Sequence, residues 1–171
     1  MNLILRELNA TDENAFLAGV KTWDGEDLTW FTFDWRPGVA FPDMLARLDS
    51  NRKGIGIPNS WVPSTMFYGF VNGMIVGRLH VRHRLNENLL KRGGHIGYAV
   101  APCFRKLGYA REMIRQELPY IRSMGIERML VTCAADNVAS IRLIGEIGGV
   151  LENEIWDDVD QEMICRYWVP L

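Results

Sequence analysis

The sequence lacks the long apolar run, the cysteine framework and the excess of basic residues that mark several large classes of protein. No stretch approaches the roughly 20 apolar residues needed to span a bilayer, and residues 1–16 lack the basic start and apolar core of a signal peptide. Three cysteines, Cys103, Cys133 and Cys165, lie too far apart to form a disulfide framework or a metal-ligand spacing. We therefore expect a cytoplasmic protein that holds no metal and meets no membrane.

The net charge of −2 argues against a nucleic-acid partner, because proteins that neutralise phosphates usually carry a basic surplus. One segment, RLHVRHRL at residues 78–85, is locally basic. Its cations alternate with apolar residues, as they do along a strand that exposes one face. We expect these cations to line a solvated strand face.

The length and composition fit one folded domain over residues 1–171. The chain has 48% hydrophobic and 23% charged residues, and it contains no internal repeat, low-complexity tract or linker. The predicted strands cover residues 2–8, a hairpin at 64–83, and residues 95–102, 127–134, 150–155 and 162–170. The predicted helices cover residues 9–20, 43–50, 109–124 and 136–149. This order predicts an α/β domain with one mixed, largely antiparallel sheet.

Local signals predict several ends of these elements. Asn72 and Gly73 are the preferred pair for a two-residue hairpin turn, since both positions need positive φ. Pro119 lies inside the helix at 109–124 and should kink or shorten it, and Gly125 should end it. Residues 86–94 are expected to form a loop before the next strand.

The junction between the strand at 95–102 and the helix at 109–124 carries the first sign of a ligand site. A tight loop into a helix leaves backbone N–H groups directed out of the helix start, at the positive end of its dipole, where phosphate binds. Gly108 gives an anion room to approach the backbone, and Arg105 and Lys106 add charge. A solvated cationic turn is the alternative, because the segment matches neither a P-loop nor a G-x-G-x-x-G pattern.

Two segments together resemble the GNAT acetyltransferase superfamily. The first segment, at residues 99–114, reads AVAPCFRKLGYAREMI and is similar to the acyl-CoA-binding strand, R/Q-x-x-G-x-G/A loop and helix of that superfamily. The second, at residues 131–149, reads VTCAADNVASIRLIGEIGG and is similar to the strand and helix that follow them. GHIGY at 94–98 is similar to a branch of predicted bacterial acetyltransferases. The resemblance implies an α+β fold whose mixed, largely antiparallel, twisted sheet of about seven strands is flanked by about four helices. It also implies acetyl-CoA as the cosubstrate and no metal.

The resemblance further implies a cofactor site. Tyr98, Ala99 and Val100 would lie beside the pantetheine arm and offer it backbone groups as an added strand would. Asn137 would hydrogen-bond the pantetheine region with Ser140 nearby; a plain helix N-cap, worth about 1 kcal/mol, is its alternative role. Main-chain N–H groups would wrap the pyrophosphate at Arg105, Lys106, Leu107, Gly108, Tyr109 and Ala110.

Acetyl transfer to an amine needs an oxyanion donor, a base for the amine and an acid for the departing thiolate. The resemblance assigns the oxyanion to the backbone N–H of Val100. Many relatives place a tyrosine acid seven residues after the asparagine, but this chain has Ile144 there, which cannot donate a proton. Ser140, Tyr98 or water would take its place, or the thiolate would leave unassisted.

Two residues are predicted as the base. His95 begins the central strand and has a suitable unperturbed pKa; a strand-end histidine bonded to nearby backbone is its alternative role. Glu87 lies in the expected loop before that strand, where most glutamates are merely solvated. His80 and the acids of residues 23–42 are the other candidates, whereas Cys133 is interpreted as a small core residue.

Residues 23–42 are rich in aromatic and acidic side chains. The aromatic side chains would wall an acceptor pocket and the acids would attract a cationic amine, although aromatics at such density more often form core. The residues concerned are Trp23, Trp30, Phe31, Phe33 and Trp35, with Asp24, Glu26 and Asp34.

The sequence thus predicts an acetyl-CoA-dependent N-acetyltransferase that acts on a primary amine of a small molecule or peptide by direct attack in a ternary complex. Two alternatives stay open. One is a non-catalytic acyl-CoA-binding domain, favoured by Ile144. The other is a nucleotide-binding module at the same cationic turn, disfavoured because no Mg²⁺-binding Ser or Thr follows the loop. The resemblance leaves room for a homodimer.

Overall fold

The structure is a computed structural model that describes residues 2–23, 25–33 and 35–171. These residues form seven strands, six α-helices and two short 3₁₀ helices. The strands are β1 (Ile4–Arg6), β2 (Ser64–Val71), β3 (Met74–Arg82), β4 (Ile96–Val100), β5 (Arg128–Ala134), β6 (Val150–Asp157) and β7 (Glu162–Pro170). The helices are α1 (Glu13–Val20), η1 (Lys21–Trp23), α2 (Thr29–Thr32), α3 (Phe41–Lys53), α4 (Glu87–Lys91), η2 (Pro102–Phe104), α5 (Tyr109–Ser123) and α6 (Val138–Glu146).

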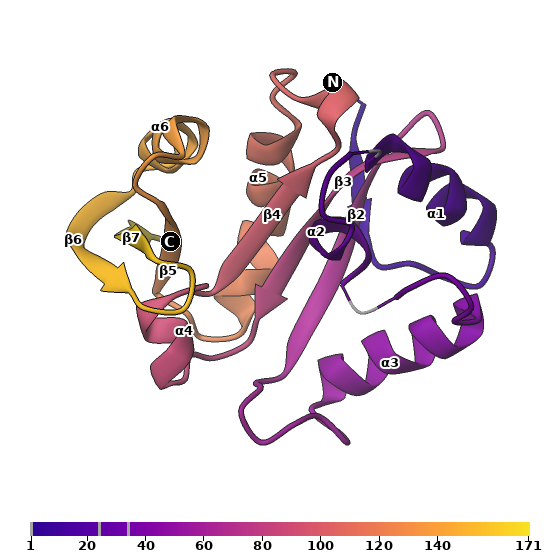
Figure 1. The fold of residues 1–171 in the computed structure, drawn as a ribbon, viewed down its shortest axis with the longest axis horizontal. Helices are drawn as coiled ribbons and strands as arrows, with labels where there is room; N and C mark the ends of the chain where they lie inside the picture. Colours follow the sequence, from indigo (N-terminus) through magenta and orange to yellow (C-terminus); the bar gives the residue numbers. More distant parts are fainter. Residues whose placement is uncertain (1, 24, 34) are drawn as a thin grey trace.

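The strands form two antiparallel sheets, which lie next to each other in Figure 1. The first has the order β1-β2-β3-β4 and the second the order β5-β7-β6. The expected fold class is confirmed, but the single mixed sheet is divided in two. The division arises because β4 and β5 form no ladder with each other in the described residues, and every ladder there is antiparallel.

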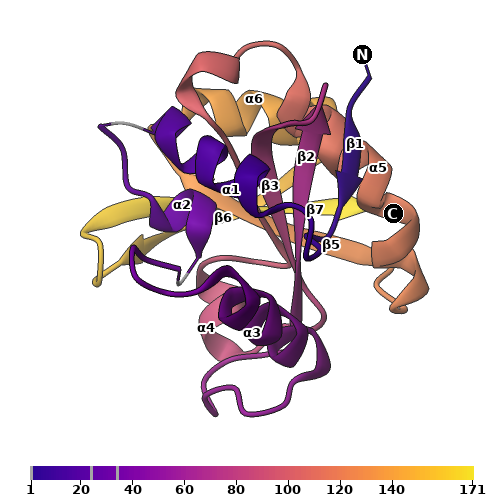
Figure 2. The ribbon, with the colours of Figure 1, turned by 90° about the vertical axis from the view of Figure 1, so that its right-hand side faces the viewer.

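Helices cover both faces of the first sheet (Figure 2). On one face α1, α2 and α3 bury an aromatic cluster, in which the rings of Phe16 and Trp23 lie 5.4 and 5.6 Å from that of Phe31. On the other face α5 packs Met113 and Ile114 into a core that it shares with the second sheet. Because burial of apolar surface is the dominant favourable term in folding, these two cores hold the first sheet in place from both sides.

Three local predictions have clear outcomes. The hairpin turn is confirmed, with φ of 50° at Asn72 and 79° at Gly73. Helix α5 continues past Pro119, so this exposed proline does not shorten it. Residues 86–94, expected as a loop, contain α4, whose first turn is capped where Asn86 accepts a hydrogen bond from the Leu89 amide at 2.9 Å.

The basic segment at 78–85 corrects the expectation of a solvated strand face. Arg78 and His80 are only 6% and 7% exposed, because Trp30 and Phe33 cover the face of β3 from which they project. The Trp30 carbonyl accepts a hydrogen bond from Arg78 Nε, and the ring of Phe33 lies 5.2 Å from that of His80. Alternation shows which side chains share a face, but it does not show which face the rest of the chain covers.

Candidate active site

The two sheets meet at His95, immediately before β4. The His95 amide donates to the carbonyl of Leu130 in β5 at 2.8 Å, and the Leu130 amide donates back to Nδ1 of the imidazole at 2.9 Å. Gly94 fits beside this pair because its φ is +58° and a Cβ there would lie 2.4 Å from the Leu130 carbonyl oxygen. Beyond this junction the two strands diverge.

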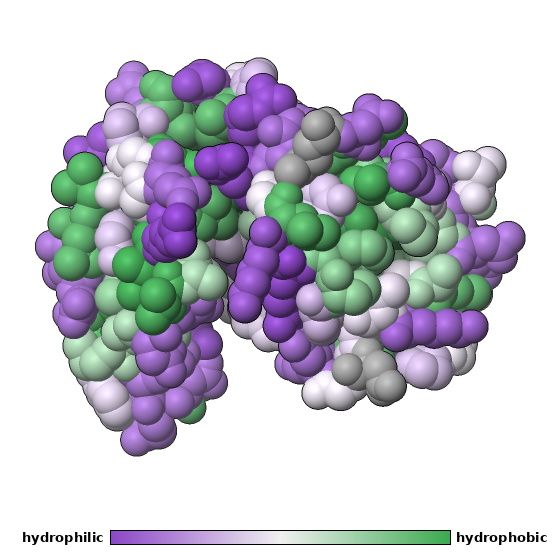
Figure 3. All heavy atoms as spheres, turned by 90° about the horizontal axis from the view of Figure 1, so that it is seen from above, coloured by the Kyte–Doolittle hydropathy of each residue, from purple (hydrophilic) through white to green (hydrophobic). Residues whose placement is uncertain are grey.

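The divergence leaves one edge of β4 without a partner strand. β3 occupies the other edge, and the Ala101 amide donates to the Val76 carbonyl at 3.0 Å just past their ladder. Alternate residues of an antiparallel ladder bond to the same neighbour, so the amides of Tyr98 and Val100 face the open edge. Figure 3 shows the molecule hollowed between the lobe of the first sheet and the lobe of the second.

The turn after β4 presents a group of unpaired backbone donors. Residues 105–108 lead into α5, with φ of 63° at Lys106 and 79° at Gly108, a backbone shape that lets successive amides converge on an anion. No described residue accepts a hydrogen bond from the amides of residues 106–111. The dipole of the 15-residue helix α5 also has its positive end here. The turn therefore fits a phosphate or pyrophosphate.

Arg105, predicted to add charge to this turn, is paired with Glu26. The guanidinium and the carboxylate form a two-pronged ion pair, with Nη1 and Oε1 2.7 Å apart. Arg105 Nε also donates to the carbonyl of Val100 at 3.1 Å. Both side chains are exposed, and the hydrogen bond from Arg105 lowers the pKa of Glu26. An anion bound at the turn would compete with Glu26 for Arg105.

Asn137 and Ser140 lie at the start of α6, on the side of the second sheet. Asn137 Oδ1 accepts a hydrogen bond from the Ser140 amide at 3.0 Å, so the N-cap role that the sequence left open for Asn137 is present. Ile144, the residue at the usual tyrosine position, is fully buried and belongs to the core beneath α5. The position therefore serves packing in this chain.

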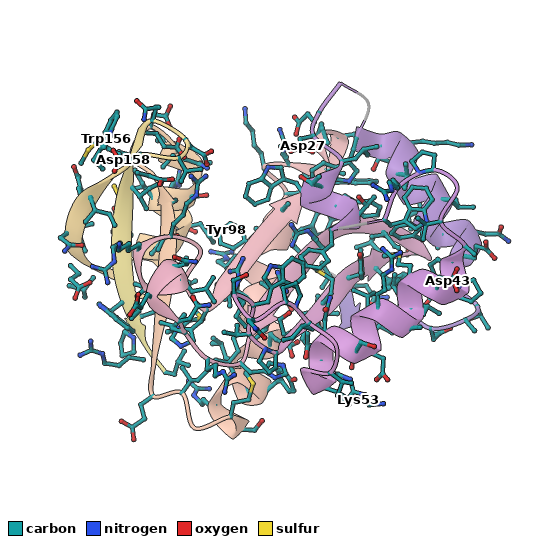
Figure 4. The ribbon with its side chains drawn as sticks, turned by 60° about the horizontal axis from the view of Figure 1, so that its bottom comes forward. Asp27, Asp43, Lys53, Tyr98, Trp156 and Asp158 are labelled. Carbon is teal, nitrogen blue, oxygen red and sulfur yellow. The ribbon has the colours of Figure 1, made fainter. Side chains whose placement is uncertain are left out.

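Tyr98 brings a buried hydroxyl into the space between the two sheets (Figure 4). The phenol oxygen has no hydrogen-bond partner among the described residues, and Ser140 is a polar neighbour. Burial raises the pKa of Tyr98 to about 12, so the phenol is neutral at physiological pH.

Burial likewise raises the pKa of Cys133 to about 11, which keeps that thiol protonated and agrees with its interpretation as a core residue.

The two predicted bases have different surroundings. His95 is 7% exposed, and burial together with Arg82 lowers its pKa to about 4. A neutral imidazole has one acceptor and one donor nitrogen, so the bond from Leu130 to Nδ1 places the proton on Nε2. This geometry favours the backbone-bonded role that the sequence left open for His95. Glu87 is exposed at the first residue of α4 and forms no ion pair with a described residue.

A second hollow lies on the face of β3 that carries His80. It is a cavity of about 310 Å³. Of the aromatic residues expected to wall an acceptor pocket, Phe33 does line this cavity, whereas Trp23 and Phe31 are buried in the core. The lining residues are Phe33, Ser60, Trp61, Val62, Ser64, His80, Arg82, Asn86, Asn88 and Leu89.

Of the three acids expected beside the acceptor, only Glu26 is among the described residues, and it does not line this cavity. Asp24 and Asp34 lie outside the described residues, and Glu26 is paired with Arg105. Sequence reasoning missed Trp61 and Arg82 as lining residues. The alternation at 78–82 was a signal for Arg82, since it places this residue on the same face as His80. Trp61 gave no such signal.

Comparisons with known proteins agree with this architecture. The chain matches the family model described as an acetyltransferase (GNAT) domain over residues 2–150, and it belongs to this family. The uncharacterized N-acetyltransferase YnaD of Bacillus subtilis is 29% identical over 84 residues, which are 43% of this chain and 49% of that protein. The match thus spans about half the length of this curated relative.

Solved structures show the same fold. A putative acetyltransferase from Salmonella typhimurium, solved with its cofactor acetyl-CoA, has a TM-score of 0.65 at 14% identity, over 100% of this chain and 95% of that one. A chimera of the spermidine N-acetyltransferase of Vibrio cholerae and hSSAT has a TM-score of 0.64 at 16% identity, over 99% of this chain and 96% of that one.

No described helix could cross a membrane, and the described residues bring together no three His, Cys, Asp or Glu side chains that could hold a metal ion.

The junction generates a prediction about stability and pH. His95→Ala removes the acceptor of the buried Leu130 amide and should lower the free energy of unfolding by about 1–3 kcal/mol at pH 7.5. The pKa of His95 in the folded protein is about 4, below the ordinary value of about 6.5. The unfolded chain therefore binds this proton more readily than the folded protein does. The stability that a neutral His95 contributes is lost as the pH falls from about 6.5 to 4. The difference between wild type and variant in urea titrations should therefore shrink at pH 5. A difference that grows at low pH would contradict this account.

The turn generates a prediction about cofactor affinity. Gly108→Val places a branched side chain where the backbone amides face outward, so it would crowd a bound pyrophosphate. Calorimetry should show that the affinity for CoA falls at least about 10-fold. Gly125→Val is the matched control. Gly125 follows the other end of α5 with φ of 77° and open space around it, so it should lose similar stability, about 1–2 kcal/mol, but no affinity. Equal CoA binding by folded samples of both variants would rule out the turn.

Proposed function

We propose that the protein is an acetyl-CoA-dependent N-acetyltransferase that moves an acetyl group to a primary amine of a small molecule or peptide by direct attack in a ternary complex. The observation that carries the proposal is the open edge of β4, where the amides of Tyr98 and Val100 face a cleft beside the donor-rich turn at 105–110. Membership of the GNAT family and likeness to a fold solved with acetyl-CoA support it.

The residues of the cleft fit each part of acetyl-CoA. The cosubstrate supplies an activated acetyl thioester, an arm with two amide groups and a pyrophosphate. The backbone groups of Tyr98 would bind the arm as an edge strand binds a peptide. The amides of residues 106–110 would bind the pyrophosphate. Asn137, which already caps α6, would hold the arm from the opposite wall.

The amide of Val100 would stabilise the oxyanion that develops when the amine attacks. It belongs to the open edge of β4, where no described residue accepts its hydrogen bond. A donor fixed in a strand is already oriented before the reaction, and such preorganised donors contribute strongly in a site that excludes water. Its position near the Tyr98 backbone would put the oxyanion next to the bound arm.

Ser140 would give a proton to the departing thiolate in place of the missing tyrosine. Its side chain is partly exposed at the start of α6 and has the Tyr98 phenol beside it. Because burial keeps the phenol protonated, Tyr98 can donate a hydrogen bond to the Ser140 oxygen. That bond would make the Ser140 proton easier to release and would hold the hydroxyl toward the sulfur.

The amine proton would go to Glu87 through water. Glu87 is exposed and directly precedes Asn88, which lines the cavity together with Asn86. His95 is the other predicted base, but its acceptor nitrogen is already bonded to the Leu130 amide. We therefore propose a structural role for His95 and the base role for Glu87.

The proposal is tested by measuring free thiol release from acetyl-CoA with a panel of amines and identifying the products by mass spectrometry. The Vibrio cholerae chimera is named for spermidine, a small amine, and the panel therefore includes polyamines, amino acids and short peptides. Calorimetric CoA binding without thiol release for any amine would instead support the non-catalytic acyl-CoA-binding domain.

The proposed acid predicts a change in turnover without a change in cofactor binding. Ser140→Ala should lower kcat about 10- to 100-fold, toward the low end of general-acid effects, while CoA affinity stays within about 2-fold, since the Ser140 amide that Asn137 caps remains. Tyr98→Phe should lower kcat less, because it removes only the supporting hydroxyl. Unchanged kcat in both variants would show that the thiolate leaves without either hydroxyl.

The proposed base predicts that Glu87→Gln lowers kcat by about 10²-fold or more at pH 7 with little change in acetyl-CoA affinity. His95→Ala, assayed per folded molecule, should keep turnover within about 3-fold of wild type, which is below the range of general-base loss. The reverse result, loss of turnover in His95→Ala and full activity in Glu87→Gln, would assign the base to His95.

A further inference from the structure

The cavity on the acceptor side combines apolar walls with a floor of hydrogen-bond donors, and no described carboxylate lines it. The apolar part comes from Phe33, Trp61, Val62 and Leu89. The polar part comes from His80 and Arg82 of β3 and from Ser60, Ser64, Asn86 and Asn88. Such a cavity can bury an apolar ligand body and direct one polar or charged end toward β3.

Arg82 is only partly used by the protein. Its Nη1 donates to the carbonyls of Gly93 at 2.7 Å and Gly94 at 3.3 Å, and no described residue accepts from Nη2 or Nε. Gly97, opposite His80 in β4, has no side chain, and a Cβ there would lie 3.6 Å from Nη2. The same Cβ would lie 3.7 Å from Nη1, so the guanidinium borders the space above Gly97, and Nη2 is its nitrogen there without a described acceptor. The guanidinium retains the paired donors that match a carboxylate.

A second guanidinium adds to the same field. Arg78 lies two residues before His80 and is 6% exposed, and its bonds go to the Trp30 carbonyl and to Met66 Sδ. No carboxylate of the described residues forms an ion pair with Arg78 or Arg82. Burial and then these two arginines lower the pKa of His80, so it is neutral at pH 7. Two positive charges without a nearby described counter-ion make the cavity electropositive.

We propose that the acceptor amine carries a carboxylate, which binds the free side of Arg82 in this cavity while its apolar body lies against Phe33 and Trp61. This substrate class rests on the proposed acetyl transfer, and it differs from the cationic amine expected from the acids of residues 23–42. A carboxylate would supply the counter-ion that the described residues do not supply.

The place of Arg82 along the sheet indicates how far the carboxylate stands from the amine. The guanidinium borders Gly97, and the proposed oxyanion donor is the Val100 amide. Three residues of extended strand separate them, about 10 Å. An α-amino acid is too short to bridge that distance. An amine and a carboxylate at opposite ends of a short chain, as in ε-aminocaproate, fit it better.

The test compares glycine, γ-aminobutyrate and ε-aminocaproate, each beside its own carboxamide, so that each pair differs in the negative charge. With wild-type protein and acetyl-CoA, kcat/KM should favour ε-aminocaproate over its amide by about 10- to 100-fold, and the preference should fall at high salt. Glycine should show little preference. Calorimetry in the presence of CoA measures binding of the same compounds independently of turnover.

Variants assign the effect to Arg82. Arg82→Gln should reduce the preference for the acid to less than about 3-fold, and Arg82→Lys, which keeps the charge but loses the paired donors, should retain part of it. Arg84→Gln is the matched control, because Arg84 is exposed and does not line the cavity. It should leave the preference unchanged. An equal loss in Arg84→Gln would show a general effect of charge and overturn the site.

The outcomes separate this proposal from the catalytic one. If no acid is preferred over its amide in either turnover or binding, the anionic site is wrong, even when the amines are acetylated. If ε-aminocaproate binds better than its amide but no amine is acetylated, the site stands and the proposed acetyl transfer fails.

Discussion

The exchange of hydrogen bonds between His95 and Leu130 is the constraint on which the rest of the site depends. The imidazole accepts the Leu130 amide, a donor that would otherwise seek a backbone carbonyl of a neighbouring strand. Because the His95 side chain takes the place of a backbone acceptor for the Leu130 amide, β4 and β5 do not continue as a ladder beyond this contact. The edge of β4 beyond it keeps the amides of Tyr98 and Val100 free of described acceptors, and an edge with free backbone donors inside a cleft is suited to an amide-containing ligand.

Arg82 links this junction to the acceptor side. One nitrogen of its guanidinium holds the carbonyls of Gly93 and Gly94, the two residues that lead into the junction. The same side chain lines the cavity. A ligand charge that orients the guanidinium would therefore act on the loop that leads into β4. The side chain that lines the cavity thus also holds the loop that leads into β4, the strand whose open edge faces the cleft.

The parts of the fold that follow from short segments could be predicted, and the parts that join distant segments could not. Asn72 and Gly73 specify their turn by local backbone preference, and the α5 start was identified from Gly108 and its neighbours. His95 depends on Leu130, 35 residues away, and the burial of Arg78 depends on Trp30, 48 residues away. The alternation at residues 78–82 does not predict that α2 covers that face. Cationic side chains on a buried strand face and on a solvated one have the same local sequence pattern.

The absence of tyrosine at position 144 follows from how α6 ends. Gly149 donates its amide to the Ile144 carbonyl at 2.8 Å, and a Cβ at Gly149 would lie 2.4 Å from the Ile144 side chain. The chain thus folds back closely over Ile144, which is fully buried, and a tyrosine there would need to bury its hydroxyl among apolar side chains. A side-chain hydroxyl near the proposed thiolate would then come from another element or another position of α6. Tyr98 on β4 has a buried and unbonded phenol beside Ser140, so this pair brings two hydroxyl groups into the space between the sheets, where the side chain at 144 brings none.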